Sequence, residues 1–277
     1  MAKLFGGKRA RIKIRDIETG VVYKSKYEAG KKLAALVGGD SSDHFVWYKI
    51  LHAFPDRFEE IKEKATSNLE AIAQRIRSNF TAKDVAREKA LRLCRETIRY
   101  SANAISAIHR NELDQTRLSL DKARQLLQEV RETLAQHGDL VYSGFVHDAQ
   151  KEYAEGCITL ALTLNQVLPT PEALGVGYAA YLHGLGEAVG ELRRYLLDTI
   201  RKGDLSRCEE LLSNMDDIYG VLVAMDFTDA LTYGLRRTTD IVRGILERTR
   251  SDLTLAMRQR DLEQKLERFK GASEESV

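Results

Sequence analysis

Long apolar runs, cysteine pairs and prolines are all scarce in this sequence of 277 residues. No run of about 18 apolar residues occurs, and 30% of the residues are charged, which argues against a membrane span or a membrane partner. The first residues, Met1 to Phe5, are not followed by the apolar stretch of a signal peptide. With only three prolines, few positions interrupt a helix. These absences favour a compact, helical, cytoplasmic protein.

The three cysteines, Cys94, Cys157 and Cys208, are isolated from one another and odd in number. Each lies in a stretch with helical periodicity. We therefore expect buried, reduced thiols, as in a cytoplasmic protein, rather than disulfides or metal ligands.

Charge is unevenly distributed along the chain. Residues 1–32 hold ten Lys or Arg and three Asp or Glu, a net charge of +7, whereas the remainder carries −5. Arg11, Lys13 and Arg15 alternate along a predicted strand and project from one side of it. A basic strand of this kind can lie on a phosphate backbone. A solvated basic tail explains the same pattern, and the sequence leaves both open.

Residues 1–57 predict a small α+β module. Apolar and polar residues alternate from residue 10, and Glu18-Thr19-Gly20 predicts the turn of a β-hairpin over residues 10–24. Ser25 is a helix N-cap, which predicts a helix over about 26–37 that ends at two glycines. A second helix is expected over about 43–53.

The rest of the chain predicts an all-α bundle over residues 58–257, followed by a charged tail over 258–277. The apolar residues recur at helical spacing, and the loops are short. The expected seven helices cover about 58–78, 82–109, 113–136, 140–167, 175–201, 205–225 and 229 to beyond 250.

Two acidic pairs lie on consecutive predicted helices. Glu187 and Glu191 are four residues apart and share a helical face, although like charges at this spacing repel. Asp148, Glu152 and Glu155 form a stripe on the preceding helix. If the two faces pack together, the carboxylates converge and require a cation. Mg²⁺ or Mn²⁺ is expected, because these hard cations prefer oxygen ligands. The alternative is that these are ordinary exposed glutamates.

Other signals near the acidic pairs carry less information. A di-iron site would use Glu-x-x-His twice, and this motif is absent from both predicted helices. His183 stands one turn before Glu187, so it is either a group that supports the metal ligands or a packed histidine. Gly184 and Gly186 lie inside a helix, so they indicate close helix approach rather than a dinucleotide-binding loop.

Arginines recur beside the acidic pairs. Arg92, Arg95 and Arg99 share a stripe on one predicted helix, and Arg194 follows Glu191. Guanidinium groups match phosphate oxygens well, so these side chains are candidate nucleic-acid contacts. A solvated charged face is the alternative.

Several segments together resemble the translin and translin-associated factor X family. They are Tyr181-Leu182-x-Gly184, Gly190-Glu191-Leu192-x-Arg194, Gly203-Asp204-x-Ser206-Arg207, Arg95-Glu96 with His109-Arg110, and Glu152-Tyr153-x-Glu155. The resemblance covers about residues 65–255 in the family's order and spacing. It implies a seven-helix translin-like bundle and a homo-oligomer of six to eight chains that binds single-stranded RNA or DNA. The module before residue 58 has no counterpart in the family pattern.

The resemblance also implies roles for single residues. Factor-X-like members are Mg²⁺-dependent endoribonucleases, and Glu152, Glu155 and Glu191 match their acidic ligands. Glu187 stands where the family usually has aspartate, which keeps the charge and lengthens the arm by one methylene group. Retention of all four carboxylates favours a metal-dependent endoribonuclease over the alternatives, which are a non-catalytic RNA- or DNA-binding oligomer of the translin type and a purely structural interaction protein.

Overall fold

The computed structural model describes residues 12–40, 45–62, 66 and 68–274, and side chains as far as residue 269. The chain forms two compact units, residues 1–81 and 82–277. Within the described residues, no helix is both long enough and apolar enough to cross a membrane. Cys94, Cys157 and Cys208 are free thiols, of which Cys157 is the least buried.

The first unit contains an antiparallel sheet in the order β2-β1-β3. Strand β1 (Ile12–Asp16) pairs with β2 (Val22–Tyr23) through the expected hairpin, and its turn uses Gly20 at a φ of 71°, a conformation that glycine adopts without strain. The other neighbour of β1 is β3 (Phe58–Lys62), with Arg15 opposite Glu59.

Two short helices cover one face of this sheet. Ser25 caps α1 (Lys26–Leu33) by accepting a hydrogen bond from the Glu28 amide, and the 3₁₀ helix η1 (Ala34–Val37) follows and ends at Gly38. Helix α2 (Val46–Ala53) adds Trp47 and Ile50 to a core that includes Ile14. The buried carboxylate of Asp16 accepts two hydrogen bonds from Arg57, which ties β1 to the segment before β3.

Strand β3 corrects the expected boundary between the modules. A helix was expected from residue 58, but residues 58–62 pair with β1 as a strand. The apolar positions of this segment also fit a strand, because a five-residue stretch is too short to separate the two periods. The small module therefore extends past residue 57, and the all-α class with a small α+β module is confirmed.

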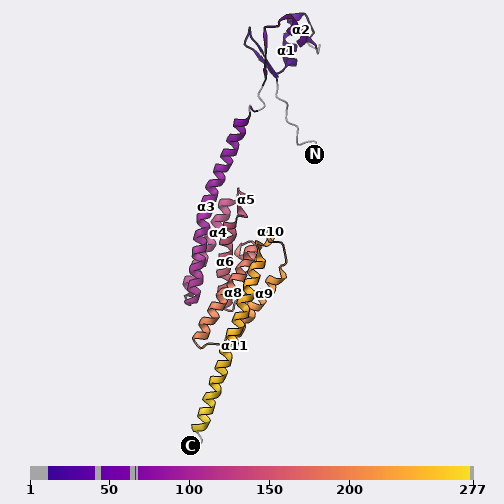
Figure 1. Cartoon of the computed structure of the whole chain (residues 1–277). Helices are drawn as coiled ribbons and strands as arrows, with labels where there is room; N and C mark the ends of the chain where they lie inside the picture. Colours follow the sequence, from indigo (N-terminus) through magenta and orange to yellow (C-terminus); the bar gives the residue numbers. More distant parts are fainter. Residues whose placement is uncertain (1–11, 41–44, 63–65, 67, 275–277) are drawn as a thin grey trace. The chain divides into compact units, whose positions relative to one another are not determined.

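The second unit is a bundle of long helices joined by short connections (Figure 1). Its main elements are the part of α3 (Leu69–His109) from residue 82 onward, α4 (Leu113–Leu134), α6 (Gly144–Thr163), α8 (Tyr178–Arg201), α9 (Cys208–Ala224) and α11 (Leu235–Glu274). The short helices α5 (Gly138–Val141), α7 (Pro171–Leu174) and α10 (Asp229–Thr232) lie in the connections.

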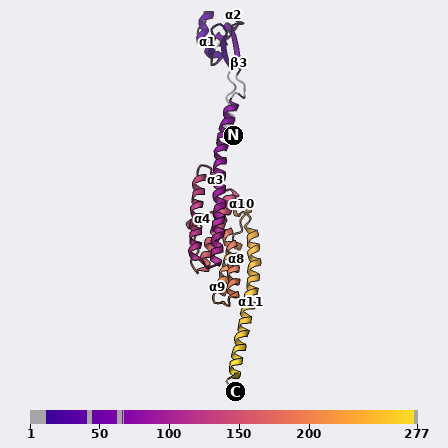
Figure 2. The same ribbon diagram turned by 90° about the vertical axis from the view of Figure 1, so that its left-hand side faces the viewer.

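One apolar core runs through the bundle. Each of α4, α6, α8, α9 and α11 contributes to it, as does α3 through Leu93. Representative buried residues on those five helices are Leu127, Ile158, Leu192, Leu211 and Val242. Helix α8 is central, because it packs against α6, α9 and α11, and the view in Figure 2 shows it between its neighbours.

Both ends of the bundle differ from the sequence-based expectation. In place of the two helices expected over about 58–78 and 82–109, the chain forms one continuous helix, α3, from Leu69 to His109. Its first turns expose an apolar stripe of Leu69, Ile72 and Ile76. At the other end, α11 continues as far as Glu274, so the tail expected from residue 258 is helical over its described part.

Candidate metal centre

Close contact between α6 and α8 creates the site. A Cβ atom at Gly184 would lie 2.9 Å from the Ala154 Cβ and 3.0 Å from both the Glu155 amide nitrogen and the Lys151 carbonyl oxygen. Only glycine therefore permits the two backbones to approach this closely. The amide of Gly177, at the start of α8, donates a hydrogen bond to Gln150, near the start of α6. Gly184, further along α8, contacts residues further along α6, so the two helices run parallel.

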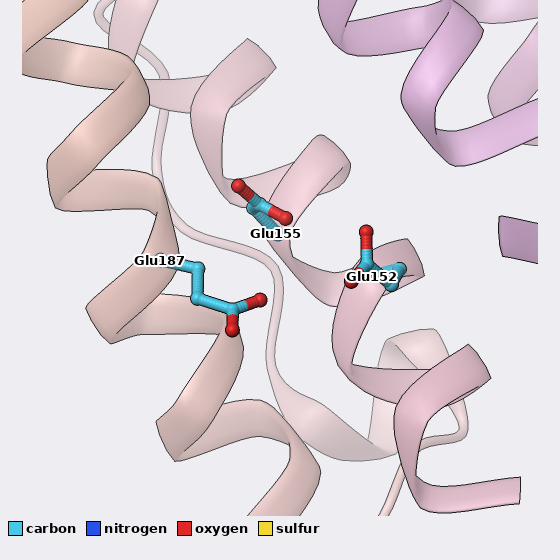
Figure 3. Close-up of side chains that lie close together, drawn as sticks. All are labelled: Glu152, Glu155 and Glu187. Atoms are coloured by element: carbon cyan, nitrogen blue, oxygen red, sulfur yellow. The ribbon is translucent and has the colours of Figure 1, made fainter. Parts of the chain in front are cut away.

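Three carboxylates meet across this contact. Glu152, Glu155 and Glu187 each offer one oxygen, and these three oxygens lie within 4.8 Å of one another. Figure 3 shows Glu187 extending from α8 toward α6, which carries the other two. The expected face-to-face packing of the acidic pairs is thus present for three of the four glutamates. Hard oxygen donors at this separation fit a divalent cation such as Mg²⁺ or Mn²⁺.

The electrostatics of the cluster are unfavourable without a cation. Burial raises the pKa of the Glu155 carboxyl to about 8, because an ionised carboxylate loses its hydration there. The neighbouring charges add to this rise, Glu187 most and then Glu152 and Glu191. Burial is also the largest cause of the raised pKa of Glu152. A bound cation would relieve both penalties.

Lys151 partly compensates this negative charge. Its Nζ lies 2.6 Å from Glu187 Oε1 and 3.3 Å from Glu152 Oε1, so it bridges α6 and α8. Burial alone would lower the pKa of Lys151, but the hydrogen bond and charges of the two glutamates outweigh this effect and raise it. The ammonium group is therefore held in its charged form beside the cluster.

The fourth predicted carboxylate, Glu191, has a different partner. Its Oε2 lies 2.5 Å from Nε2 of His109, whose side chain is buried at the end of α3. The other ring nitrogen of His109, Nδ1, is buried and has no hydrogen-bond partner among the described residues. Arg194 is exposed, and its Nη1 lies 3.9 Å from the same Glu191 oxygen. Glu191 thus lies beside the three-carboxylate cluster rather than within it.

Neither of the two predicted supporting residues contacts the cluster through a described hydrogen bond. His183 Nε2 lies 2.8 Å from the carbonyl oxygen of Thr232, and Nδ1 lies 2.9 Å from the Thr238 hydroxyl. Because a carbonyl only accepts, Nε2 donates to Thr232, and both ring nitrogens of the buried His183 are used in packing contacts away from the cluster. Asp148 is exposed and pairs with His147 at 3.7 Å.

The predicted phosphate contacts lie on two units. Arg92, Arg95 and Arg99 are exposed on α3, as a nucleic-acid contact requires. In the small module, Arg11 lies outside the described residues. Arg15 pairs with Glu59 of β3 at 3.5 Å, so one acidic residue of the unexpected strand opposes the basic side of β1. Lys13 lies on that same side, opposite Ile61. Nucleic-acid binding by these residues remains a prediction.

Sequence reasoning missed Lys151 and gave His109 too little weight. Lys151 directly precedes Glu152, but a lysine beside a glutamate is common on any helix surface, so its position carried no signal. His109 is 82 residues from Glu191 in the chain, and only the fold brings them together. The resemblance did include His109-Arg110 in its motif, which was the one available hint.

The fold and the site define a class: an all-α bundle with a carboxylate cluster between two parallel helices. No protein-family model matches the chain. The structures of AfC3PO alone and of its complex with duplex RNA are 32% identical to it, each with a TM-score of 0.61. They match 68% of this chain, and the match covers 98% of AfC3PO in the first and 97% in the second.

Two further proteins are similar. An uncharacterized protein of Methanocaldococcus jannaschii is 29% identical over 204 residues, which are 71% of this chain and 89% of that protein. The structure of apo-NeC3PO has a TM-score of 0.57 over 70% of this chain and all of its own, but at 18% identity it supports the fold alone. The chain belongs to the translin and translin-associated factor X family.

Proposed function

We propose that this protein is a metal-dependent endoribonuclease that uses Mg²⁺ or Mn²⁺ to cut single-stranded RNA. The observation that carries the proposal is the convergence of Glu152, Glu155 and Glu187 within 4.8 Å. The similarity to AfC3PO, whose complex with duplex RNA is known, supports RNA as the substrate. A cytoplasmic location is part of this proposal, since RNA is abundant there.

The three clustered carboxylates would hold the cation through their oxygens. When bound, such a cation lowers the pKa of a coordinated water and stabilises the leaving oxygen of a phosphodiester. Glu191 would stay fixed by His109 beside the cluster. The exposed Arg194 guanidinium, which lies within 3.9 Å of Glu191, would contact a substrate phosphate.

The direct test incubates the purified protein with labelled single-stranded and duplex RNA, in Mg²⁺ and in EDTA. We expect internal cleavage of the single strand that EDTA abolishes. Glu152→Gln and Glu187→Gln should each reduce cleavage by about 100-fold or more, because each removes a charged ligand. Glu209→Gln, on an exposed turn of α9, changes the net charge equally and is the matched control. No cleavage in Mg²⁺, cleavage that persists in EDTA, or cleavage unaffected by either Glu variant would refute the proposed metal-dependent nuclease.

The alternative is a non-catalytic oligomer that binds single-stranded RNA or DNA. The exposed stripe of Arg92, Arg95 and Arg99 fits this non-catalytic role as well as it fits the nuclease. Phosphate-driven binding weakens as salt rises, with a slope of about 0.7 per phosphate contact on a single strand. Replacing all three arginines by alanine should lower that slope by about 2, whereas Arg117→Ala on α4 should not. If the triple variant binds with an unchanged salt slope and the unmodified protein does not cleave RNA, these arginines do not contact phosphates, and both the nuclease and the binding role of this face are refuted.

We also propose that the protein is a homo-oligomer, within the range of six to eight chains. Leu69, Ile72 and Ile76 lie on one exposed stripe at the start of α3, and Phe80 extends it. Exposed apolar stripes of this kind commonly mark protein contacts. Light scattering after size exclusion should give a mass of six to eight chains, and Ile72→Asp with Ile76→Asp should reduce it. A monomer in the unmodified protein would contradict the proposal.

A further inference from the structure

A lysine side chain lies where the acidic cluster would bind its metal ion. Lys151 Nζ is 2.6 Å from Glu187 Oε1 and 3.3 Å from Glu152 Oε1. The Lys151 side chain is 19% exposed, so it reaches the cluster from the edge of the α6–α8 contact rather than from the core. Its four-carbon stem is flexible, as in any lysine.

An ammonium group and a divalent cation both bind carboxylate oxygens, and Lys151 already lies against two of the three clustered carboxylates. A metal bound by carboxylates lies about 2.0–2.2 Å from each oxygen. The N–H groups of Lys151 already point at one oxygen of Glu187 and one of Glu152, and the two positive charges would repel each other at this distance. This repulsion disfavours occupation of the inner side of the cluster by both cations together.

We propose that Lys151 is a built-in counter-cation that competes with the divalent metal for Glu152 and Glu187. The inference rests on the proposed metal site and adds a property to it. In metal-free protein the ammonium neutralises part of the cluster and keeps α6 and α8 together. Metal binding displaces the ammonium toward solvent. Lys151 therefore sets the metal concentration at which the site fills, and it holds the carboxylates in place until then.

The test measures metal affinity rather than activity. Mn²⁺ is titrated into the full-length protein. Binding is followed by calorimetry and by the loss of the electron paramagnetic resonance signal of free Mn²⁺. Lys151→Met removes the charge and keeps the stem, and we expect it to tighten Mn²⁺ binding by about tenfold or more. Lys151→Arg keeps a competing charge and should stay close to the unmodified protein. Lys89→Met, which removes an ammonium paired at 2.9 Å with Glu129, is the control for net charge.

A second measurement uses the unmodified protein, so it does not depend on the variant folding. The protein is treated with an amine-acylating reagent with and without Mg²⁺, and acylation of Lys151 is followed by mass spectrometry. Displacement predicts that Mg²⁺ increases acylation of Lys151 severalfold and leaves Lys89 unchanged. Protection of Lys151 by Mg²⁺ would overturn the inference.

The outcomes separate the two proposals. If the unmodified protein binds Mn²⁺ and Lys151→Met binds it with the same affinity, competition is refuted and the proposed nuclease site stands. If Lys151→Met binds more weakly, Lys151 supports the metal instead of competing with it, and the inference is again wrong. If no variant binds metal, the metal site itself is refuted, and the counter-cation role falls with it.

Discussion

Replacing Glu155 by glutamine tests the electrostatics of the carboxylate cluster. Glutamine has nearly the shape of a protonated glutamate and stays neutral at every pH. The pKa of Glu155 rises from 4.5 to about 8 on folding, so the folded protein holds a proton that the unfolded chain releases. The contribution of this residue to stability is thus fully present below pH 4.5 and declines as the pH rises toward 8.

The size of the effect follows from the same shift. A solution at pH 7 is 2.5 pH units above 4.5, the pKa of Glu155 in the unfolded chain. Each of these units lowers the free energy of unfolding by about 1.4 kcal/mol. Metal-free Glu155→Gln should therefore be more stable than the unmodified protein by up to about 3 kcal/mol at pH 7. The difference should vanish near pH 4. For a bundle of this size, 3 kcal/mol raises Tm by roughly 6–12 °C.

The assay follows helix unfolding by circular dichroism in EDTA, across pH 4 to 8. Tryptophan fluorescence is unsuitable, because the single tryptophan, Trp47, lies in the small module. Mg²⁺ at about 1,000 times its Kd should reverse the order, since it would stabilise the unmodified protein by about 4.1 kcal/mol. The control Glu209→Gln should behave like the unmodified protein. If Glu155→Gln differs from the unmodified protein by the same free energy of unfolding at pH 4 and pH 7, or is the less stable of the two at pH 7, this reasoning is refuted.

Two further substitutions test the packing around the site and the small module. Gly184→Ala places a Cβ against backbone atoms of α6 at 3.0 Å, so we expect a loss of about 1–3 kcal/mol and weaker Mn²⁺ binding by calorimetry; Gly190→Ala, whose Cβ would meet only one side-chain atom at 4.0 Å, should cost nothing. Equal effects at both positions would contradict the close contact. Asp16→Asn removes the charged partner of Arg57, and we expect the module to lose about 2 kcal/mol at pH 7, read from the fluorescence of Trp47. Because Arg57 lowers the pKa of Asp16, this stabilisation is present above pH 3.8 and is lost as the pH falls through the folded-state pKa, so a variant equal to the unmodified protein at pH 7 would contradict it.

Much of the fold could be predicted from the sequence, because local signals determine much of it. Helical periodicity gave α4, α8 and α9 to within a few residues, and Ser25 and Gly20 gave the first helix and the hairpin turn. The errors lie where local signals are ambiguous. Strand β3 is short and polar, and its identity depends on β1, which is more than 40 residues away in the chain.

The candidate site could be predicted only in part, for a similar reason. Helical spacing and the resemblance indicated which glutamates would converge, and three of them do. Spacing could not reveal that His109 holds Glu191, or that His183 turns away to Thr232, because both depend on which helix lies opposite. Nor does spacing predict that an ammonium group would occupy the cluster.

The separation along the chain of these partners bears on the order in which the site assembles. Lys151 and Glu187 are 36 residues apart, whereas His109 and Glu191 are 82 apart. Closing the shorter loop costs less chain entropy, and the helix pair α6–α8 with its crossover contains all three clustered carboxylates. This segment can therefore form its cluster before α3 docks. Metal added during refolding should protect amides of α6 and α8 from hydrogen exchange earlier than those of α3, so the site would help to guide the folding of the bundle.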